Sequence, residues 1–301
     1  MIYVATEQGI WKKHNADLYS EWEGLGLHKK NVKDIIVFDD NTLLAGIDIL
    51  QTGAGLVSLF HTTSGGMKWN AYLNNYGGEG GWTPMMSMTK HPVNSDTIFV
   101  TGSANVARST DRGETWESIH LSWDNIGMGN YFVNINEQFP ENIWSGGQAS
   151  IFEPFLVRSK DSGETWEYVE IFAGGDNVCF DVAVHPTDPD RVLAAFGGGI
   201  LDVNAREEIN TPVLEAAAYF RALVISPANP ETVYAGVEDG GPLTIYKTTD
   251  WGQNWETISH LDGLEADVMD VLVLNYGNGD EVYLATTKGV FVYSNGTFKR
   301  F

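Results

Sequence analysis

The stretch RSTDRGETWES at residues 108–118 returns almost unchanged at residues 158–168, as RSKDSGETWEY. Both copies contain the motif Ser/Thr-x-Asp-x-Gly-x-x-Trp. A third copy, TTDWGQNW, lies at residues 248–255, and a degraded fourth copy, TTSGGMKW, lies at residues 62–69. A motif that recurs within one chain is the sequence signature of a repeat architecture.

The spacing of the motif defines the length of the repeat. The motif glycines are Gly66, Gly113, Gly163 and Gly252, and the gaps between them are 47, 50 and 89 residues. The last gap is close to two repeats, so one unit has kept its length and lost its motif. Alternating apolar positions and β-branched or aromatic content predict strands throughout. Short apolar runs that end in small residues occur seven times, at residues 2–6, 42–46, 97–102, 142–147, 191–197, 232–236 and 281–286.

Four short strands in each repeat of about 40 to 50 residues predict a β-propeller. We expect an all-β fold, with one propeller domain over residues 1–301 and seven four-stranded antiparallel blades; six blades is the alternative count. No inner strand precedes the run at residues 2–6, so the first blade should have three strands or share strands between the two termini. The approximate blades are 1–30, 31–80, 81–125, 126–172, 173–216, 217–262 and 263–301.

The residue types of the motif fit a structural turn. Gly113 and its equivalents can adopt positive φ, which a tight turn between two strands requires. Asp111 and its equivalents can accept backbone N–H groups across that turn. Trp116 and its equivalents can bury a large ring between neighbouring blades. These aspartates are therefore expected to be scaffolding and not catalytic groups.

The motif resembles the Asp-box (BNR) repeat, and the chain resembles Asp-box propellers such as sialidases, sortilin-type domains and xyloglucan-cleaving glycosidases. The resemblance implies that the motif turns lie on the outer rim, away from the ligand channel. It favours an extracellular or periplasmic location, although the first residues show no signal-peptide pattern. It does not select one family within this superfamily, and it specifies architecture better than activity.

Composition excludes several classes of partner. The formal net charge is −22, and a surface this acidic repels phosphate backbones and anionic membranes. No run of about 18 apolar residues predicts a membrane span. We therefore expect no nucleic acid partner and no membrane insertion. The single cysteine, Cys179, lies in the apolar run NVCFDVAV and is expected to be a buried, inert thiol.

The candidate site residues lie in loops expected at the end of the blades opposite the motif turns. Several of these loops combine aromatic rings with carboxylates, which is the usual equipment for holding sugars. The candidate ligand-binding residues are Trp82, Trp123, Tyr131, Tyr219, Arg221, Glu238 and Asp239. A glycosidase would need two carboxylates, and the candidates for that pair are Glu79, Asp124 and Asp176.

Other chemistry finds little support in the sequence. A typical sialidase needs an arginine cluster and an Arg-Ile-Pro motif near its start, and the first arginine here is Arg108. The histidines show no metal-ligand spacing, so no metal site and no cofactor are predicted. Calcium on loop carboxylates such as Glu238 and Asp239 is the one alternative.

The leading hypothesis is a non-enzymatic binding or assembly propeller that takes a saccharide, peptide or protein on its acidic, aromatic loop face. The first alternative is a carbohydrate-active enzyme, a glycoside hydrolase or a polysaccharide lyase, that uses paired loop carboxylates. The second alternative is a structural subunit of an extracellular or virion assembly. The sequence alone does not decide among these three.

Overall fold

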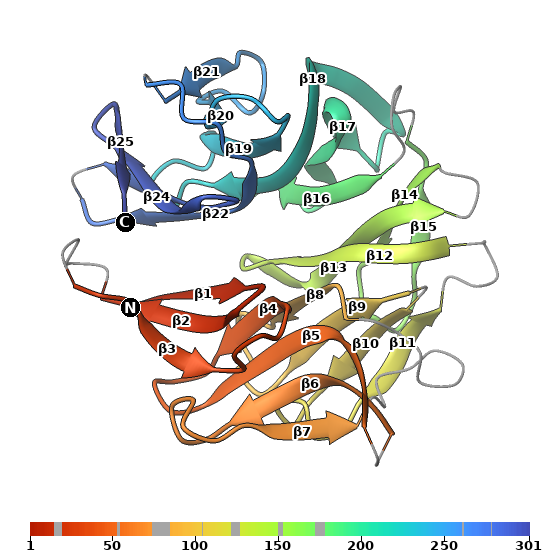
Figure 1. The fold of residues 1–301 in the computed structure, drawn as a ribbon. Coiled ribbons are helices and arrows are strands. Elements are labelled where there is room, and N and C mark those ends of the chain that lie inside the picture. Colours follow the sequence, from red (N-terminus) through yellow and green to blue (C-terminus); the bar gives the residue numbers. More distant parts are fainter. Residues whose placement is uncertain are drawn as a thin grey trace. The chain divides into compact units, whose positions relative to one another are not determined.

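The structure is a computed structural model. It describes residues 1–14, 20–52, 55–73, 85–103, 105–121, 127–149, 153–171, 178–260, 262–277 and 279–301. Within these residues the chain forms 25 strands in six antiparallel sheets (Figure 1). The chain divides into two compact units, Met1–Ser145 with Ser159–Trp166 and Gly146–Arg158 with Glu167–Phe301.

Three sheets lie within the first unit, and each is built from consecutive strands. The first has the order β1-β2-β3, with strands Ile2–Thr6, Gly9–Lys13 and Glu23–Gly26. The second has the order β4-β5-β6-β7, with strands Val32–Val37, Leu43–Thr52, Gly55–Thr62 and Asn70–Leu73. The third has the order β11-β10-β9-β8, with β8 at Ser87–Lys90, β9 at Ile98–Gly102, β10 at Asn105–Ser109 and β11 at Glu117–Leu121.

The remaining three sheets follow the same rule. One has the order β12-β13-β14-β15, with strands Gly127–Asn136, Phe139–Ala149, Pro154–Ser159 and Glu167–Val169. The next runs from β16 to β21, with strands Cys179–Val184, Arg191–Asn204, Ile209–Ile225, Val233–Glu238, Thr244–Thr248 and Glu256–Ser259. The last runs from β22 to β25, with strands Val268–Asn275, Asp280–Thr286, Gly289–Ser294 and Thr297–Arg300.

Sheets of this kind, built one after another from consecutive antiparallel strands, are the blades of a β-propeller. The all-β propeller class is therefore as predicted, and the first sheet of the described residues has three strands, one of the two arrangements expected for the first blade. The predicted count of seven blades is wrong: the described residues form six sheets, which matches the alternative count.

The lost blade has a physical cause in strand β18. The predicted boundary between residues 216 and 217 falls inside this strand, which runs without a break from Ile209 to Ile225. Its first part pairs with β17, where Leu214 lies opposite Ile200, and its last part pairs with β19, where Leu223 lies opposite Ala235. Two repeat lengths therefore share one strand and merge into a six-stranded sheet.

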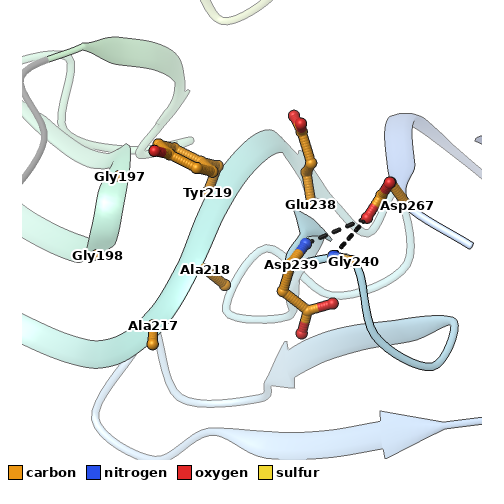
Figure 2. Close-up of a pocket in the computed structure, with 9 residues that line it drawn as sticks. All are labelled: Gly197, Gly198, Ala217, Ala218, Tyr219, Glu238, Asp239, Gly240 and Asp267. Atoms are coloured by element: carbon orange, nitrogen blue, oxygen red, sulfur yellow. Dashed lines mark hydrogen bonds between the residues drawn. The ribbon is translucent and has the colours of Figure 1, made fainter.

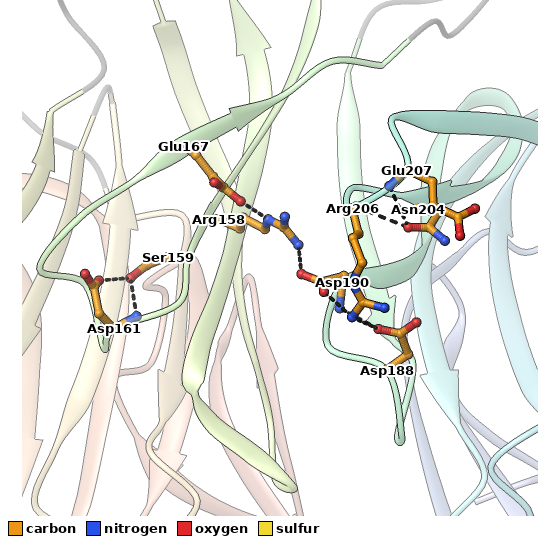
Figure 3. Close-up of polar contacts among 9 residues, drawn as sticks. All are labelled: Arg158, Ser159, Asp161, Glu167, Asp188, Asp190, Asn204, Arg206 and Glu207. Atoms are coloured by element: carbon orange, nitrogen blue, oxygen red, sulfur yellow. Dashed lines mark hydrogen bonds and ion pairs between the residues drawn. The ribbon is translucent and has the colours of Figure 1, made fainter.

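Strand β17 doubles back on itself within that sheet. The bend lies at Gly198, which has a φ of 96°. Beyond this glycine the chain runs back toward the start of β17, as two contacts show: Arg191 forms an ion pair with Asp202, and the Ala205 N–H donates to Asp190 O at 2.9 Å. The following turn stands where the missing motif was expected. There Asn204 Oδ1 accepts the N–H groups of Arg206 and Glu207, at 3.1 and 3.2 Å (Figure 3).

The motif turns are closed by their own side chains, as predicted. In the second copy, Ser159 Oγ accepts the Gly163 N–H at 2.8 Å, and Asp161 Oδ1 accepts the Thr165 N–H at 2.8 Å. The Thr165 hydroxyl donates to the other oxygen of Asp161 at 2.6 Å and, with the Thr165 N–H, lowers the pKa of that carboxyl. The glycine has a φ of 95°. The copies around Asp111 and Asp250 repeat these bonds.

The motif tryptophans pack where the sequence predicted. Trp116 lies against a core cluster that contains Leu44 of β5 and Ile98 of β9, so its ring joins two neighbouring sheets. Trp166 packs in the same way against Phe99 of β9 and Val133 of β12. Burial of such large rings supplies much of the hydrophobic stabilisation between sheets.

A buried ion-pair network lies beside the second motif (Figure 3). Arg158 is only 3% exposed, and its guanidinium donates to both Glu167 and Asp190. Arg206 also donates to Asp190, and to Asp188 at 3.1 Å. A charge buried this deeply requires such partners, so Arg158 serves the scaffold and not a ligand.

Candidate functional site

A hollow of about 440 Å³ lies in the second compact unit, over strands β17, β18 and β19 and the turn that precedes β22 (Figure 2). Three of the residues predicted from sequence line it: Tyr219, Glu238 and Asp239. Asp267 lines it as well. The hollow thus brings one aromatic ring together with three acids.

Strand pairing explains why these residues meet. Tyr219 of β18 lies directly opposite Glu238 of β19 on one side and opposite Gly197 of β17 on the other. The rest of the wall consists of small residues, Gly197, Gly198, Ala217 and Ala218, whose side chains leave the space open. The hollow is therefore a product of small residues on two paired strands.

Asp267 fixes the rim of the hollow. Its Oδ1 accepts the N–H groups of Asp239 at 3.2 Å and Gly240 at 2.9 Å (Figure 2). Its own N–H donates to Thr287 Oγ1 at 3.1 Å. The Asp239 carboxylate in turn accepts the Gly241 N–H at 2.8 Å. These bonds hold the turn between β19 and β20 against the start of β22, so the rim is ordered before any ligand arrives.

Arg221, the fourth predicted residue here, supports the wall. Its guanidinium pairs with Glu238 and lies over the Phe180 ring, 4.2 Å from its centroid, and over the Tyr219 ring, 5.6 Å from its centroid. The Phe180 and Tyr219 rings meet edge to face, with centroids 6.0 Å apart. Contacts of this kind orient an arginine and the rings beside it. Tyr219 nevertheless stays 38% exposed, so its ring can contact a ligand.

The hollow and the third motif turn lie at opposite ends of β20. The turn with Asp239 and Gly240 precedes that strand, and the turn with Asp250 follows it. The candidate residues that the hollow unites therefore stand at the end of the sheet away from the motif.

Tyr131 is the one other candidate that the structure describes, and it does not line the hollow. Tyr131 lies on β12, within the first compact unit, and is half-buried. The remaining candidates fall outside the residues that the structure describes, so their placement stays a prediction. They are Glu79, Trp82, Trp123, Asp124 and Asp176.

Sequence reasoning missed Asp267 and Phe180. Asp267 is one of 40 acids and belongs to no repeated motif, so only the backbone pairing reveals its role. Phe180 lies in the apolar run NVCFDVAV, which reads as a core strand. The pairing of β16 with β17 shifts its register between Cys179 and Asp181, so simple alternation in the sequence could not show where the Phe180 ring lies.

The described residues contain neither a reactive thiol nor a group of metal ligands. Burial raises the pKa of the Cys179 thiol well above its usual range, which fits an inert core residue. In the described ranges, no group of three or more His, Cys, Asp or Glu side chains is placed to hold a metal ion.

Of the seven arginines, all of which are described, six pair with carboxylates. No helix among the described residues is long and apolar enough to cross a membrane.

Comparisons with known proteins identify the fold. No protein-family model matches the chain, and no curated protein sequence matches it. The solved structure of the GH74 xyloglucanase from Xanthomonas campestris matches 96% of the chain with a TM-score of 0.70 and 14% identity. The chain spans about half of that enzyme, 49% of its length.

Two structures of YCF48 match as well. YCF48 from Cyanidioschyzon merolae matches 96% of this chain and 89% of its own, with a TM-score of 0.65 and 11% identity. YCF48 bound to D1 peptide matches 90% of this chain and 82% of its own, with a TM-score of 0.59 and 18% identity. Identities this low support the β-propeller fold alone, and they do not extend to the Asp-box repeat or the sialidase superfamily.

Proposed function

We propose that this chain is a ligand-binding propeller whose recognition site includes the hollow around Tyr219. The observation that carries the proposal is the combination of an exposed aromatic ring with a rim that Asp267 has already ordered. A site that is ordered before binding loses little conformational entropy when the ligand arrives.

The chemistry of the hollow favours a ligand that donates hydrogen bonds and carries an apolar face. Glu238, Asp239 and Asp267 are acceptors, and the Tyr219 ring offers a surface for stacking. A saccharide has both properties, since its hydroxyls donate and its ring faces are apolar. An anionic ligand is disfavoured by the three acids and by the net charge of −22.

The hydrogen bonds that Glu238, Asp239 and Asp267 accept favour binding without catalysis. Glu238 accepts from Arg221, Asp239 from the Gly241 N–H, and Asp267 from two backbone N–H groups. A glycosidase needs one carboxyl that donates a proton to the leaving oxygen. In the hollow, all three acids instead accept bonds that hold strands and turns in place.

The structural neighbours are consistent with both a binding and an enzymatic role. One neighbour is a xyloglucanase by name, and another is a propeller bound to a peptide. The enzymatic alternative for this chain is a carbohydrate-active enzyme, and a third alternative is a structural subunit of an assembly. The four repeated turns are proposed to be Asp-box turns, on the strength of their shared hydrogen bonds.

A glycan and polysaccharide array, run beside an assay for newly released reducing ends, tests the proposal. The expected result is saturable binding of a saccharide with no product. The Tyr219→Ala variant should lose at least tenfold in affinity, because the stacking surface disappears. Tyr168→Ala is the matched control, since Tyr168 is 47% exposed on β15, away from the hollow, and its loss should leave binding unchanged.

Two results would overturn the proposal. Release of products that stops in Glu238→Gln or Asp267→Asn would establish the enzymatic alternative. Saccharide binding that Tyr219→Ala leaves intact, or that falls equally in Tyr219→Ala and Tyr168→Ala, would place the site elsewhere on the protein.

A further inference from the structure

The first hairpin of the chain repeats the hairpin of the last sheet. Residues 2–11 read IYVATEQGIW, and residues 282–291 read VYLATTKGVF. Strand β1 pairs with β2 so that Thr6 lies opposite Gly9, and β23 pairs with β24 so that Thr286 lies opposite Gly289.

The two turns also share their hydrogen bonds and backbone conformation. Thr6 Oγ1 donates to Gly9 O at 2.8 Å, and Thr286 Oγ1 donates to Gly289 O at 2.6 Å. The two glycines have φ values of 115° and 112°. Sequence, register and turn geometry therefore make β1 the counterpart of β23.

The two strands differ at their other edge. Strand β23 pairs there with β22, which places Val271 opposite Leu284 and Leu272 opposite Tyr283. In the described part of the chain, β1 is an edge strand with β2 as its one neighbour in the sheet. The side chains reflect this difference, because Leu284 is 0% exposed while its counterpart Val4 is half-buried.

The free edge of β1 carries backbone groups in a defined order. Bonds in an antiparallel pair alternate, so every second residue of a strand faces each neighbour. Because Thr6 and Gly9 close a two-residue turn, Thr6, Val4 and Ile2 face β2. Tyr3 and Ala5 consequently direct their N–H and C=O groups to the free edge, as Tyr283 and Ala285 do toward β22.

We propose that the free edge of β1 binds one extended segment of another polypeptide, which adds to the sheet as an antiparallel strand. Strand β22 defines the chemistry of that segment, since it covers the equivalent edge of β23. The segment has about five residues, with valine, leucine or isoleucine at alternate positions. Its backbone pairs with Tyr3 and Ala5, and its apolar side chains cover Val4. No residue of this edge lines the hollow around Tyr219.

A synthetic peptide with the sequence of Val268–Asn275, flanked by lysines for solubility, is the probe. Fluorescence anisotropy should show saturable binding to the full chain. Hydrogen exchange followed by NMR should slow at the Tyr3 and Ala5 amides when the peptide is present. The Val4 amide, which already bonds β2, should change little.

Two N-methylated peptides provide a matched pair. Methylation at the position of Leu272 removes an N–H that faces the partner strand, and should weaken binding at least tenfold. Methylation at the position of Val271 blocks an N–H that faces away, and should leave affinity within about twofold. Both peptides leave the protein itself unchanged, so a folding defect cannot explain the difference.

Three outcomes would overturn the proposal. The first is equal binding by both methylated peptides, since binding would then not use strand pairing. The second is binding without protection of Tyr3 and Ala5. The third is protection of both amides in the protein alone together with a dimer in sedimentation, because a second copy would then fill the edge.

Discussion

Asp267 holds Gly240, with 2.9 Å between the aspartate Oδ1 and the glycine nitrogen, and so ties the rim of the hollow to the last sheet. The same oxygen also accepts the Asp239 N–H. One side chain outside the sheet β16–β21 thus determines where a turn of that sheet lies, and this makes Asp267 the most informative residue to change.

Replacing Asp267 by alanine should loosen the rim and leave the fold intact. The lost hydrogen bonds are solvent-accessible, so we expect a cost of about 1 kcal/mol in the free energy of unfolding. Saccharide affinity should fall by more than this small loss of stability would produce by itself, because the rim is no longer ordered before binding. Urea unfolding and the binding assay measure the two effects, with Asp262→Ala as the exposed control. Equal affinities for both variants would contradict the role assigned to Asp267.

Two glycines with positive φ should respond differently to alanine. At Gly163 a Cβ would lie 2.5 Å from Ile119 Cδ1, the end of a side chain that must then shift, so Gly163→Ala adds a packing cost to backbone strain and should lose roughly 1–3 kcal/mol. At Gly240 no atom lies within 4 Å of that position, so Gly240→Ala should cost only about 1 kcal/mol of backbone strain. Thermal unfolding of both variants checks the order. Equal losses would mean that the packing of the motif turn against Ile119 is loose.

Removing the buried guanidinium should be among the costliest changes to the scaffold. Arg158→Ala leaves Asp190 buried beside an empty space, and we expect a loss of about 3–5 kcal/mol. Arg206 is the matched control, since it pairs with the same aspartate but its side chain is 61% exposed. Arg206→Ala should cost no more than about 1 kcal/mol. Denaturant unfolding of the two variants distinguishes a buried network from a surface one.

Stability should fall when the pH drops from neutral toward 5.5. Burial lowers the pKa of His120, and also of His61, His91 and His185. Below the ordinary histidine pKa of about 6.5, the unfolded chain takes up protons that the folded chain does not, so unfolding is favoured. The loss begins near that pH and continues until the folded histidines titrate.

His120→Phe should reduce this pH dependence. The phenyl ring can keep the contact with Trp166, whose ring centroid lies 4.9 Å from that of His120. The variant should therefore lose less in melting temperature between pH 7.5 and 5.5 than the original protein does. Parallel curves for the two proteins would show that His120 contributes nothing to the acid sensitivity.

Local patterns predicted the parts of this fold that local chemistry determines. The motif around Asp161 specified a turn and its hydrogen bonds, because each of these bonds joins residues four positions apart. The motif also predicted that the Trp166 ring is buried between neighbouring repeats, but its partners Phe99 and Val133 are distant in sequence and only the structure identifies them. The apolar run at residues 2–6 likewise marked the first strand of the sheet β1-β2-β3. Blade number was missed because it depends on whether two repeat lengths are separated at residues 216 and 217. Strand β18 runs unbroken through that point and pairs with β17 before it and with β19 after it.

The sequence predicted only some of the residues that line the hollow. Tyr219, Glu238 and Asp239 were chosen for their residue types, and the pairing of β18 with β19 brings them together. Asp267 lies 28 residues after Asp239, so no local pattern could link the two. The small residues that create the hollow have no chemistry of their own, and only the tertiary structure gives them a role.

The shared strand β18 also affects how the protein can be taken apart. Where repeats are joined by loops, the chain can be cut or its termini relocated between them with little damage. A new opening between Ala216 and Ala217 would instead cut strand β18 between the part that pairs with β17 and the part that pairs with β19, and so divide the six-stranded sheet. The two repeat lengths from 173 to 262 should therefore melt together, resist protease at their junction, and tolerate neither circular permutation nor domain insertion at that point.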